Sequence, residues 1–418
     1  MYPRRSPRFI TYSHEYWGTQ AGAWGMRGGQ PRAWGRADRM LYKMASTHSG
    51  YTKMHTFSIL QRRLLSSRNT LLHKMLQKPK VLRLGAWGEA KAAWAELGEI
   101  VEIVDCESKT RDEFFADLKT KYNDITSIVR TFFSVNNTGR FDAELAAHLP
   151  ETVKSVLHNG AGYDQIDVQP FTDKGIQVSN ITTPVEAPTA LTAVYLTLAA
   201  LRNFQQGHEL LTEGKWSSGG KCAGANLGLD PEGLTVGIIG MGGIGRAIRD
   251  RLVPFGFGKV VYYNRSRLSS ELENGAEYVT FDDLVAKSDV IMLSVPLNAK
   301  THHLINADVL AKTKKGVVIV NTARGAVIDE KALTDALKSG HIGAFGSDVF
   351  EHEPEVAPEL YNMLNVVSLP HMGTHTKQAL VNMEAFVVEN VKTYLTTGKM
   401  LTNVPEQASV DFKHTPVI

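Results

Sequence analysis

The chain has 418 residues, of which 43% are hydrophobic and 21% are charged, and its formal net charge is +3. This length and composition are typical of a soluble globular protein with about two domains. Cys106 and Cys222 are the only cysteines, which argues against a disulfide framework or a zinc site and fits a reducing compartment. No apolar run reaches the roughly 18 residues that a membrane span needs, so we expect no membrane partner.

Charge is divided unevenly along the chain. Residues 1–80 contain 15 Lys and Arg against 2 Asp and Glu, whereas the remainder carries a net charge of −10. Because the body is acidic, we expect no nucleic-acid partner. Residues 1–53 lack periodicity and are predicted to be disordered.

Residues 54–77 form a basic amphipathic segment. Apolar residues recur there at helical spacing, with basic and hydroxyl residues between them and no acidic residue. This pattern is typical of a mitochondrial presequence. The alternative is an over-long reading frame with a true start at Met54 or Met75, and a start at Met75 would leave a cytosolic protein. We therefore treat residues 1–78 as a disordered basic extension or a targeting segment.

Short apolar runs alternate with helical patterns through the rest of the chain, in two series. This alternation predicts an α/β fold with two Rossmann-like domains, each a doubly wound parallel sheet, and a cleft between them. The predicted strands lie at 81–85, 101–105, 127–130, 155–160 and 176–180, and then at 234–240, 259–264, 289–296, 316–323, 343–350 and 365–370.

Two long helices separate the predicted domains. One is predicted at 186–202, before a Gly/Ser/Lys-rich stretch at 214–228 that predicts a surface loop or arm. The other, at 376–397, could cross back to the first domain and make it discontinuous. The predicted bounds are 79–185 with 375–405 for the first domain, 186–374 for the second, and 406–418 for a C-terminal tail.

A glycine-rich turn joins the predicted strand 234–240 to a helix. Gly240, Gly242 and Gly245 have the spacing G-x-G-x-x-G within a strand–turn–helix unit. These glycines permit a tight turn, a close backbone approach to a pyrophosphate, and close packing of helix on strand. Unpaired N–H groups at the helix N-terminus can bind phosphates, so the unit predicts a dinucleotide site. The alternative is a glycine-rich turn without a ligand.

The residues at the end of the next predicted strand favour NADP(H) over NAD(H). Asn264 stands where an NAD-binding protein normally carries Asp or Glu, and Arg265, Ser266 and Arg267 follow it. With no carboxylate to repel it, a 2′-phosphate would meet two guanidinium groups and a hydroxyl. NADP(H) is therefore preferred, while neutral hydrogen bonds from Asn264 leave NAD(H) possible. An ordinary exposed basic turn is the alternative.

Three polar residues follow successive strand-like runs near the end of the second series. They are Arg324, Glu353 and His371. An arginine can hold a carboxylate, an imidazole can pass a proton, and a glutamate can keep that imidazole charged. With a hydride carrier at the glycine turn, this set suggests reduction of a 2-keto acid.

Five longer stretches surround these residues: HNGAGYDQIDV (158–168), VGIIGMGGIGR (236–246), VVIVNTARGAVID (317–329), GSDVFEHEP (346–354) and LPHMGTHT (369–376). Together they resemble the D-isomer-specific 2-hydroxyacid dehydrogenase family, and within it most of all the fungal glyoxylate and hydroxypyruvate reductases. The resemblance covers nearly all of the chain after residue 80. It implies a substrate-binding first domain, an NAD(P)-binding second domain, and a homodimer with 214–228 as its arm.

The resemblance also implies roles for single residues. Arg324 would clamp the substrate carboxylate, His371 would protonate the carbonyl oxygen, and Glu353 would be the partner of His371. Ala161 and Gly162 would offer backbone N–H groups to the carboxylate, and no metal is expected. The predicted cofactor contacts are Gly240, Gly242, Gly243, Ile244, Gly245, Asn264, Arg265, Ser266, Arg267, Val295, Pro296, Thr322, Asp348 and His371, with Asp348 bonded to the nicotinamide amide.

Two other functions remain open from the sequence. The first is a D-mandelate-like dehydrogenase for bulkier 2-keto acids, for which Trp87 could line an apolar pocket. The second is a dinucleotide-sensing binding protein similar to the corepressors built on this fold. His302 and His303 are predicted to be loop residues near the cofactor.

Overall fold

The computed structural model describes residues 78–418, so the predictions of disorder and targeting for residues 1–77 fall outside it. Two sheets, both with parallel strand pairs only, form the described part. Helices cover them, as the connections between parallel strands require. The predicted α/β class with two parallel-sheet domains is confirmed.

The first sheet has five strands in the order β2-β1-β3-β4-β5. Its strands are β1 (Lys80–Leu84), β2 (Glu102–Asp105), β3 (Ile125–Arg130), β4 (Ser155–His158) and β5 (Gln177–Ser179). All four residues of the inner strand β4 are buried, which is typical of a parallel strand covered on both faces. All five strands fall where the sequence predicted them.

The second sheet has seven strands in the order β12-β11-β10-β9-β6-β7-β8. Its strands are β6 (Thr235–Ile239), β7 (Lys259–Tyr263), β8 (Glu277–Tyr278), β9 (Val290–Leu293), β10 (Val317–Asn321), β11 (Ile342–Ser347) and β12 (Val366–Ser368). The order reverses beside β6, so the turn after β6 lies at the switch point where ligands of such sheets bind. Six strands were predicted, and the two-residue edge strand β8 was missed.

The helices of the first half are α3 (Lys91–Ile100), α4 (Arg111–Leu118), α5 (Val135–Thr138), α6 (Ala143–His148) and α7 (Val168–Asp173). Those of the second half are α8 (Glu186–Leu201), α9 (Phe204–Thr212), α10 (Trp216–Gly219), α11 (Gly243–Leu252), α12 (Ser270–Glu273), α13 (Phe281–Lys287), α14 (Ala307–Ala311), α15 (Glu330–Lys338) and α16 (Pro358–Tyr361). The last helix, α17 (Lys377–Thr397), belongs with the first sheet. Polar N-caps set several starts; the Thr376 hydroxyl, for example, accepts a hydrogen bond from the backbone N–H of Ala379.

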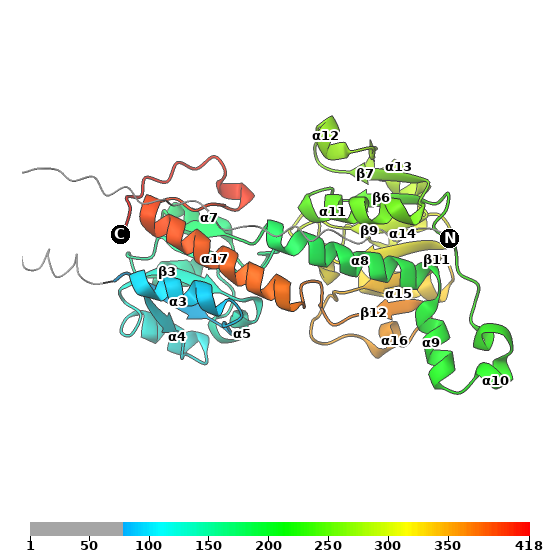
Figure 1. The fold of residues 1–418 in the computed structure, drawn as a ribbon, viewed down its shortest axis with the longest axis horizontal. Coiled ribbons are helices and arrows are strands. Elements are labelled where there is room, and N and C mark those ends of the chain that lie inside the picture. The colour runs from blue at the N-terminus through cyan, green and yellow to red at the C-terminus, as the bar shows by residue number, and fades with distance from the viewer. Residues whose placement is uncertain (1–77) are drawn as a thin grey trace, which may run out of the picture. The chain divides into compact units, whose positions relative to one another are not determined.

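The long helix α8 packs in the core of the second half, against α11, β10 and β11 (Figure 1). By length and composition the segment Thr183–Leu201 could cross a membrane. One face of this helix, which includes Ala193 and Leu196, is buried among residues of the second sheet, whereas Leu191 and Tyr195 are exposed. Packing in the core therefore accounts for part of its hydrophobicity.

The last helix, α17, returns to the first sheet. It contacts α3 and β4, and Figure 1 shows it beside α3. The Glu384 carboxylate accepts hydrogen bonds from the Trp94 indole and from the backbone N–H groups of Gly88 and Ala90. These bonds join helix α17 to the segment between β1 and α3.

Residues 204–229 extend from the end of α8. The predicted loop at 214–228 includes the short helix α10 and a 3-10 turn, Lys221–Gly224, and α9 precedes it. Large apolar side chains are exposed along this arm, including Leu211, Trp216 and Leu227.

Candidate functional site

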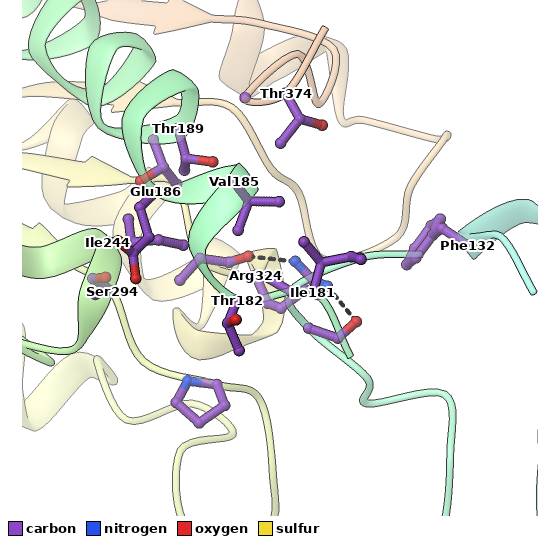
Figure 2. Close-up of a pocket in the computed structure, with 18 of the residues that line it drawn as sticks. Phe132, Ile181, Thr182, Val185, Glu186, Thr189, Ile244, Ser294, Arg324 and Thr374 are labelled. Atoms are coloured by element: carbon purple, nitrogen blue, oxygen red, sulfur yellow. Dashed lines mark hydrogen bonds between the residues drawn. The ribbon is translucent and has the colours of Figure 1, made fainter. Parts of the chain in front are cut away.

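A cavity of about 420 Å³ lies where loops from the two sheets meet. Side chains from the first half, such as Phe132 and Ile181, line it together with Ser294 and Arg324 from the second half (Figure 2). The loops come from the carboxyl ends of the strands, where parallel sheets gather functional residues. The cavity therefore collects residues that are far apart in sequence.

Arg324 crosses this cavity to the opposite loop. Its Nε donates to the Asp164 carboxylate at 2.8 Å, Nη2 donates to the Gly162 carbonyl at 3.2 Å, and Nη1 donates to the carbonyl of Ala323. A guanidinium has five N–H donors, so these three bonds leave one on each terminal nitrogen. Arg324 is thus fixed in place with two donors left for a planar anion such as a carboxylate.

The loop after β4 requires small residues. A Cβ on Gly162 would overlap the guanidinium of Arg324, and one on Gly160 would lie 2.7 Å from the His158 ring. The Ala161 carbonyl accepts a hydrogen bond from the Asn180 amide at 2.6 Å. Ala161 and Gly162 both line the cavity, as their predicted role requires.

His371 and Glu353 form a hydrogen-bonded pair, with Nδ1 of the imidazole 2.7 Å from Oε2 of the carboxylate. The other carboxylate oxygen accepts from the Phe350 backbone N–H at 2.9 Å. Burial would raise the pKa of Glu353, but the hydrogen bond and charge of His371, with the Phe350 N–H, hold it below its ordinary value. Glu353 is therefore ionised near neutral pH and orients the imidazole.

Asp348 fixes the turn that carries His371. Its two carboxylate oxygens accept the backbone N–H groups of Met372 and Gly373 at 2.6 and 2.7 Å, and its carbonyl accepts that of His371. Burial raises the Asp348 pKa, partly offset by these N–H groups. His371 has φ +54°, in the left-handed region that is uncommon for a non-glycine residue. The predicted nicotinamide contact of Asp348 stays a prediction.

The glycine turn between β6 and α11 has the geometry of a dinucleotide site. Gly240 has φ +97°, and a Cβ on Gly245 would overlap the Gly240 carbonyl, so both positions need glycine. A Cβ on Gly242 would meet no atom within 4 Å, which leaves its backbone open to a ligand. The hydroxyl of Thr322, buried in the cavity wall, makes no hydrogen bond within the described residues. These features fit a pyrophosphate and its attached groups.

The two arginines of the basic turn after β7 have different surroundings. Arg267 forms a two-point ion pair with Glu273, at 2.7 and 3.0 Å. Among residues 78–418, no ion pair or side-chain hydrogen bond engages Arg265, and Ser266 beside it is exposed. Asn264 accepts the backbone N–H of Met241 at 2.7 Å and so joins this turn to the glycine turn. One of the two guanidiniums predicted for a 2′-phosphate is therefore already paired.

The predicted residues fall into two groups. Those that line the cavity are Ala161, Gly162, Gly242, Gly243, Ile244, Val295, Pro296, Thr322, Arg324, Asp348 and His371. Those outside its lining are Gly240, Gly245, Asn264, Arg265, Ser266, Arg267 and Glu353. Glu353 is hydrogen-bonded to His371, which does line the cavity.

Three residues at or next to the cavity were not predicted from the sequence. Phe132 lies edge-on to the His371 ring and beneath the Arg324 guanidinium, and Asp164 pairs with Arg324. Glu186, at the start of α8, lies against Gly243 beside Ile244 and Ser294 (Figure 2). Only Asp164 had a sequence signal, because it belongs to the stretch 158–168. Trp87, by contrast, is not a lining residue; its ring packs against Trp94.

Comparison with known proteins agrees with this site. Residues 194–373 match the model for the NAD-binding domain of D-isomer-specific 2-hydroxyacid dehydrogenases. Glyoxylate reductase 1 of Saccharomyces cerevisiae is 52% identical over 342 residues, which cover 81% of this chain and 98% of the yeast protein. The chain belongs to the D-isomer-specific 2-hydroxyacid dehydrogenase family. It is an NAD(P)-dependent dehydrogenase that reduces a 2-keto acid, so the alternative of a binding protein is set aside.

Other relatives show how the family varies. The 4-methyl-2-oxopentanoate reductase A of Aspergillus oryzae is 46% identical and aligns over 79% of this chain and 99% of its own. A glyoxylate reductase crystal structure from Paecilomyces thermophila has a TM-score of 0.75 at 44% identity, covering 79% of this chain and 99% of that one. An NADPH-dependent glyoxylate/hydroxypyruvate reductase from Sinorhizobium meliloti, solved with NADP and malonate, has a TM-score of 0.69 at 31% identity, over 79% and 98%.

Proposed function

We propose that the protein is an NADPH-dependent reductase of glyoxylate or hydroxypyruvate. The observation that carries this proposal is the convergence of Arg324 and the His371–Glu353 pair on one cavity beside the glycine turn. The names of the yeast and Paecilomyces relatives support the choice of substrate.

Arg324 would bind the carboxylate of the 2-keto acid through its two remaining N–H donors. A guanidinium suits this task because it stays charged and presents its donors in one plane. The Asp164 bond fixes its orientation before substrate arrives, which lowers the entropy cost of binding. Backbone N–H groups of Ala161 and Gly162 would add to the same subsite.

His371 would give its proton to the carbonyl oxygen. Because Nδ1 faces Glu353, Nε2 is the nitrogen left to act. A bound nicotinamide dinucleotide would supply the hydride to the carbonyl carbon. Hydride and proton together convert the keto acid to the 2-hydroxy acid, and the positive imidazole would stabilise the oxygen as it gains charge.

NADPH rather than NADH is proposed because Arg265 and Ser266 are available at the edge where a 2′-phosphate would lie. Gly242, Gly243 and the α11 N-terminus would hold the pyrophosphate. The NADPH-dependent Sinorhizobium relative supports this choice.

Phe132 favours a small substrate over a bulky one. Its ring lies 5.6 Å from that of His371, and the Arg324 guanidinium carbon lies 5.8 Å from its centre. The ring thus lies beside both groups that would hold the substrate. The apolar wall with Phe133, Ile181 and Met383, and the name of the Aspergillus relative, make a bulkier 2-keto acid the second candidate.

A steady-state panel tests the proposal. Purified protein would be assayed with glyoxylate, hydroxypyruvate, phenylglyoxylate and 2-ketoisocaproate, each with NADPH and NADH. We expect the highest kcat/KM for one of the two small acids with NADPH. A higher value for phenylglyoxylate or 2-ketoisocaproate would favour the second candidate, and no turnover of any acid would refute both.

We also propose a homodimer that uses the arm at 204–229. Its exposed apolar side chains, with Trp216 63% exposed, are costly to leave in water. Light scattering should give twice the monomer mass, and Trp216→Ser should shift the equilibrium toward monomer.

A further inference from the structure

A second cluster of ligand-type side chains lies outside the cavity lining. His302 and His303 are in the turn between β9 and α14, and Glu351 follows β11. One ring nitrogen of each histidine and one Glu351 carboxylate oxygen lie within 4.8 Å of one another. We propose that these three side chains form a binding site for a transition-metal cation of the zinc type.

Backbone hydrogen bonds fix the turn that carries both rings. The N–H of His302 donates to the Asn298 carbonyl at 2.9 Å, and that of His303 donates to the Ala326 carbonyl at 2.8 Å. His303 has φ +47°, and the two rings stack with their centres 4.0 Å apart. The turn therefore places two imidazoles side by side on a fixed stretch of backbone.

Glu351 completes the set from the other segment. Its Oε1 lies 2.7 Å from Nε2 of His303, and its backbone N–H donates to the Glu330 carboxylate at 2.6 Å. Glu353 lies two residues further along the same segment, so three carboxylates, those of Glu330, Glu351 and Glu353, are gathered beside the two histidines. The cluster thus lies in acidic surroundings that attract a cation.

The two imidazole nitrogens and one carboxylate oxygen favour a particular kind of metal. Zinc binds imidazole nitrogen and carboxylate oxygen at about 2.0–2.2 Å in a tetrahedron, which places ligand atoms roughly 3.3 Å apart. The His303–Glu351 pair, at 2.7 Å, would have to widen and the exposed His302 side chain would have to move inward from within 4.8 Å to bind one ion. Two imidazoles with one carboxylate suit zinc or its first-row neighbours better than Mg²⁺ or Ca²⁺, which take oxygen ligands.

Metal binding at this site would restrict the segment that carries Glu353. A cation would replace the His303–Glu351 hydrogen bond and restrain Glu351, two residues before Glu353. Because Glu353 orients His371, we expect zinc at this site to slow turnover.

Titration calorimetry of the full chain with Zn²⁺ tests the site. His302→Gln and Glu351→Gln should each weaken binding at one site by at least about tenfold to a hundredfold, the range for changes even to outer-shell groups. His208→Gln, on the exposed surface of α9, is the control and should bind as the wild type does. Histidines in residues 1–77 could bind zinc as well. The measured quantity is therefore the difference in zinc affinity and stoichiometry between each variant and the wild type.

The second readout is turnover. Without zinc, His302→Gln should reduce the keto acid as fast as the wild type, and it should resist zinc concentrations that inhibit the wild type. Unchanged zinc affinity and stoichiometry in His302→Gln and Glu351→Gln would overturn the site. Binding is measured without substrate, so its outcome is independent of which keto acid the enzyme reduces.

Discussion

The loops after β10, β11 and β12 differ from the basic turn after β7 in the ion pairs that their charged side chains form. In the first region, Arg324 pairs with Asp164 and His371 with Glu353, and each pair joins segments distant in sequence. In the second, Arg267 pairs with the nearby Glu273, and Arg265 is exposed.

The difference bears on what each region can do. Partly buried and multiply bonded groups keep one geometry, as a reacting centre requires. An exposed arginine retains its hydration and rotamer freedom, so it contributes to the affinity for a phosphate rather than to the rate of the chemical step. We therefore expect substitutions in the first region to have larger effects than those in the second.

His371→Ala should give the largest effect. Loss of a general acid typically lowers kcat by about 10²–10⁴-fold, while cofactor binding should stay normal by fluorescence titration. His375→Ala is the matched control, because His375 is exposed and does not line the cavity. Retained turnover in His371→Ala would refute the assignment of the proton donor.

Asp164→Asn should raise the KM for the keto acid by roughly tenfold to a hundredfold, because a charge-assisted hydrogen bond to Arg324 is weakened. Asp167→Asn is the control, since Asp167 pairs with Arg140 in an exposed position. Such pairs contribute about 0–1 kcal/mol, so KM should change little. Equal KM changes in both variants would contradict the anchoring role of Asp164.

Arg265→Gln should lower kcat/KM for NADPH by about tenfold and leave that for NADH nearly unchanged. Arg267→Gln should move the NADPH/NADH ratio much less, because Glu273 already engages Arg267. The more drastic Arg265→Asp should shift preference toward NADH. An unchanged ratio in both Arg265 variants would remove the phosphate site from this turn.

Glu353→Gln should lower the free energy of unfolding by about 1 kcal/mol near pH 6. The pKa of Glu353 lies below its ordinary 4.5, so its stabilising contribution is full above that value and is lost as pH falls through the lowered pKa. Urea unfolding between about pH 6 and pH 3 should therefore show the gap between wild type and variant closing on the acid side. A gap that is independent of pH would contradict the ion pair.

The strand pattern could be predicted well because buried parallel strands read as short apolar runs. The edge strand β8 has only two residues and no such run, so it was missed. Helix α9 was missed because its apolar residues, such as Phe204 and Leu211, are exposed rather than packed on the sheet.

The site was predictable only where a motif carries it. Arg324 and Asp164 lie 160 positions apart, and no local pattern indicates that they touch. The pairing of Arg267 with Glu273 depends on the fold of the short helix α12, which basic residues in a row do not reveal. The interpretation of Trp87 as a pocket residue was wrong because its indole donates to the Leu84 carbonyl and stays in the first half.

The Arg324–Asp164 hydrogen bond joins the two halves of the described chain, so it depends on the distance between them. The backbone passes from one sheet to the other near Thr183–Glu186 and returns near Thr374–Lys377. Rotation about these two crossings would separate the guanidinium from its carboxylate by widening the cavity. Loss of the Asp164 bond would free the Arg324 side chain, so the two halves must keep their present spacing for the substrate carboxylate to meet a fixed guanidinium.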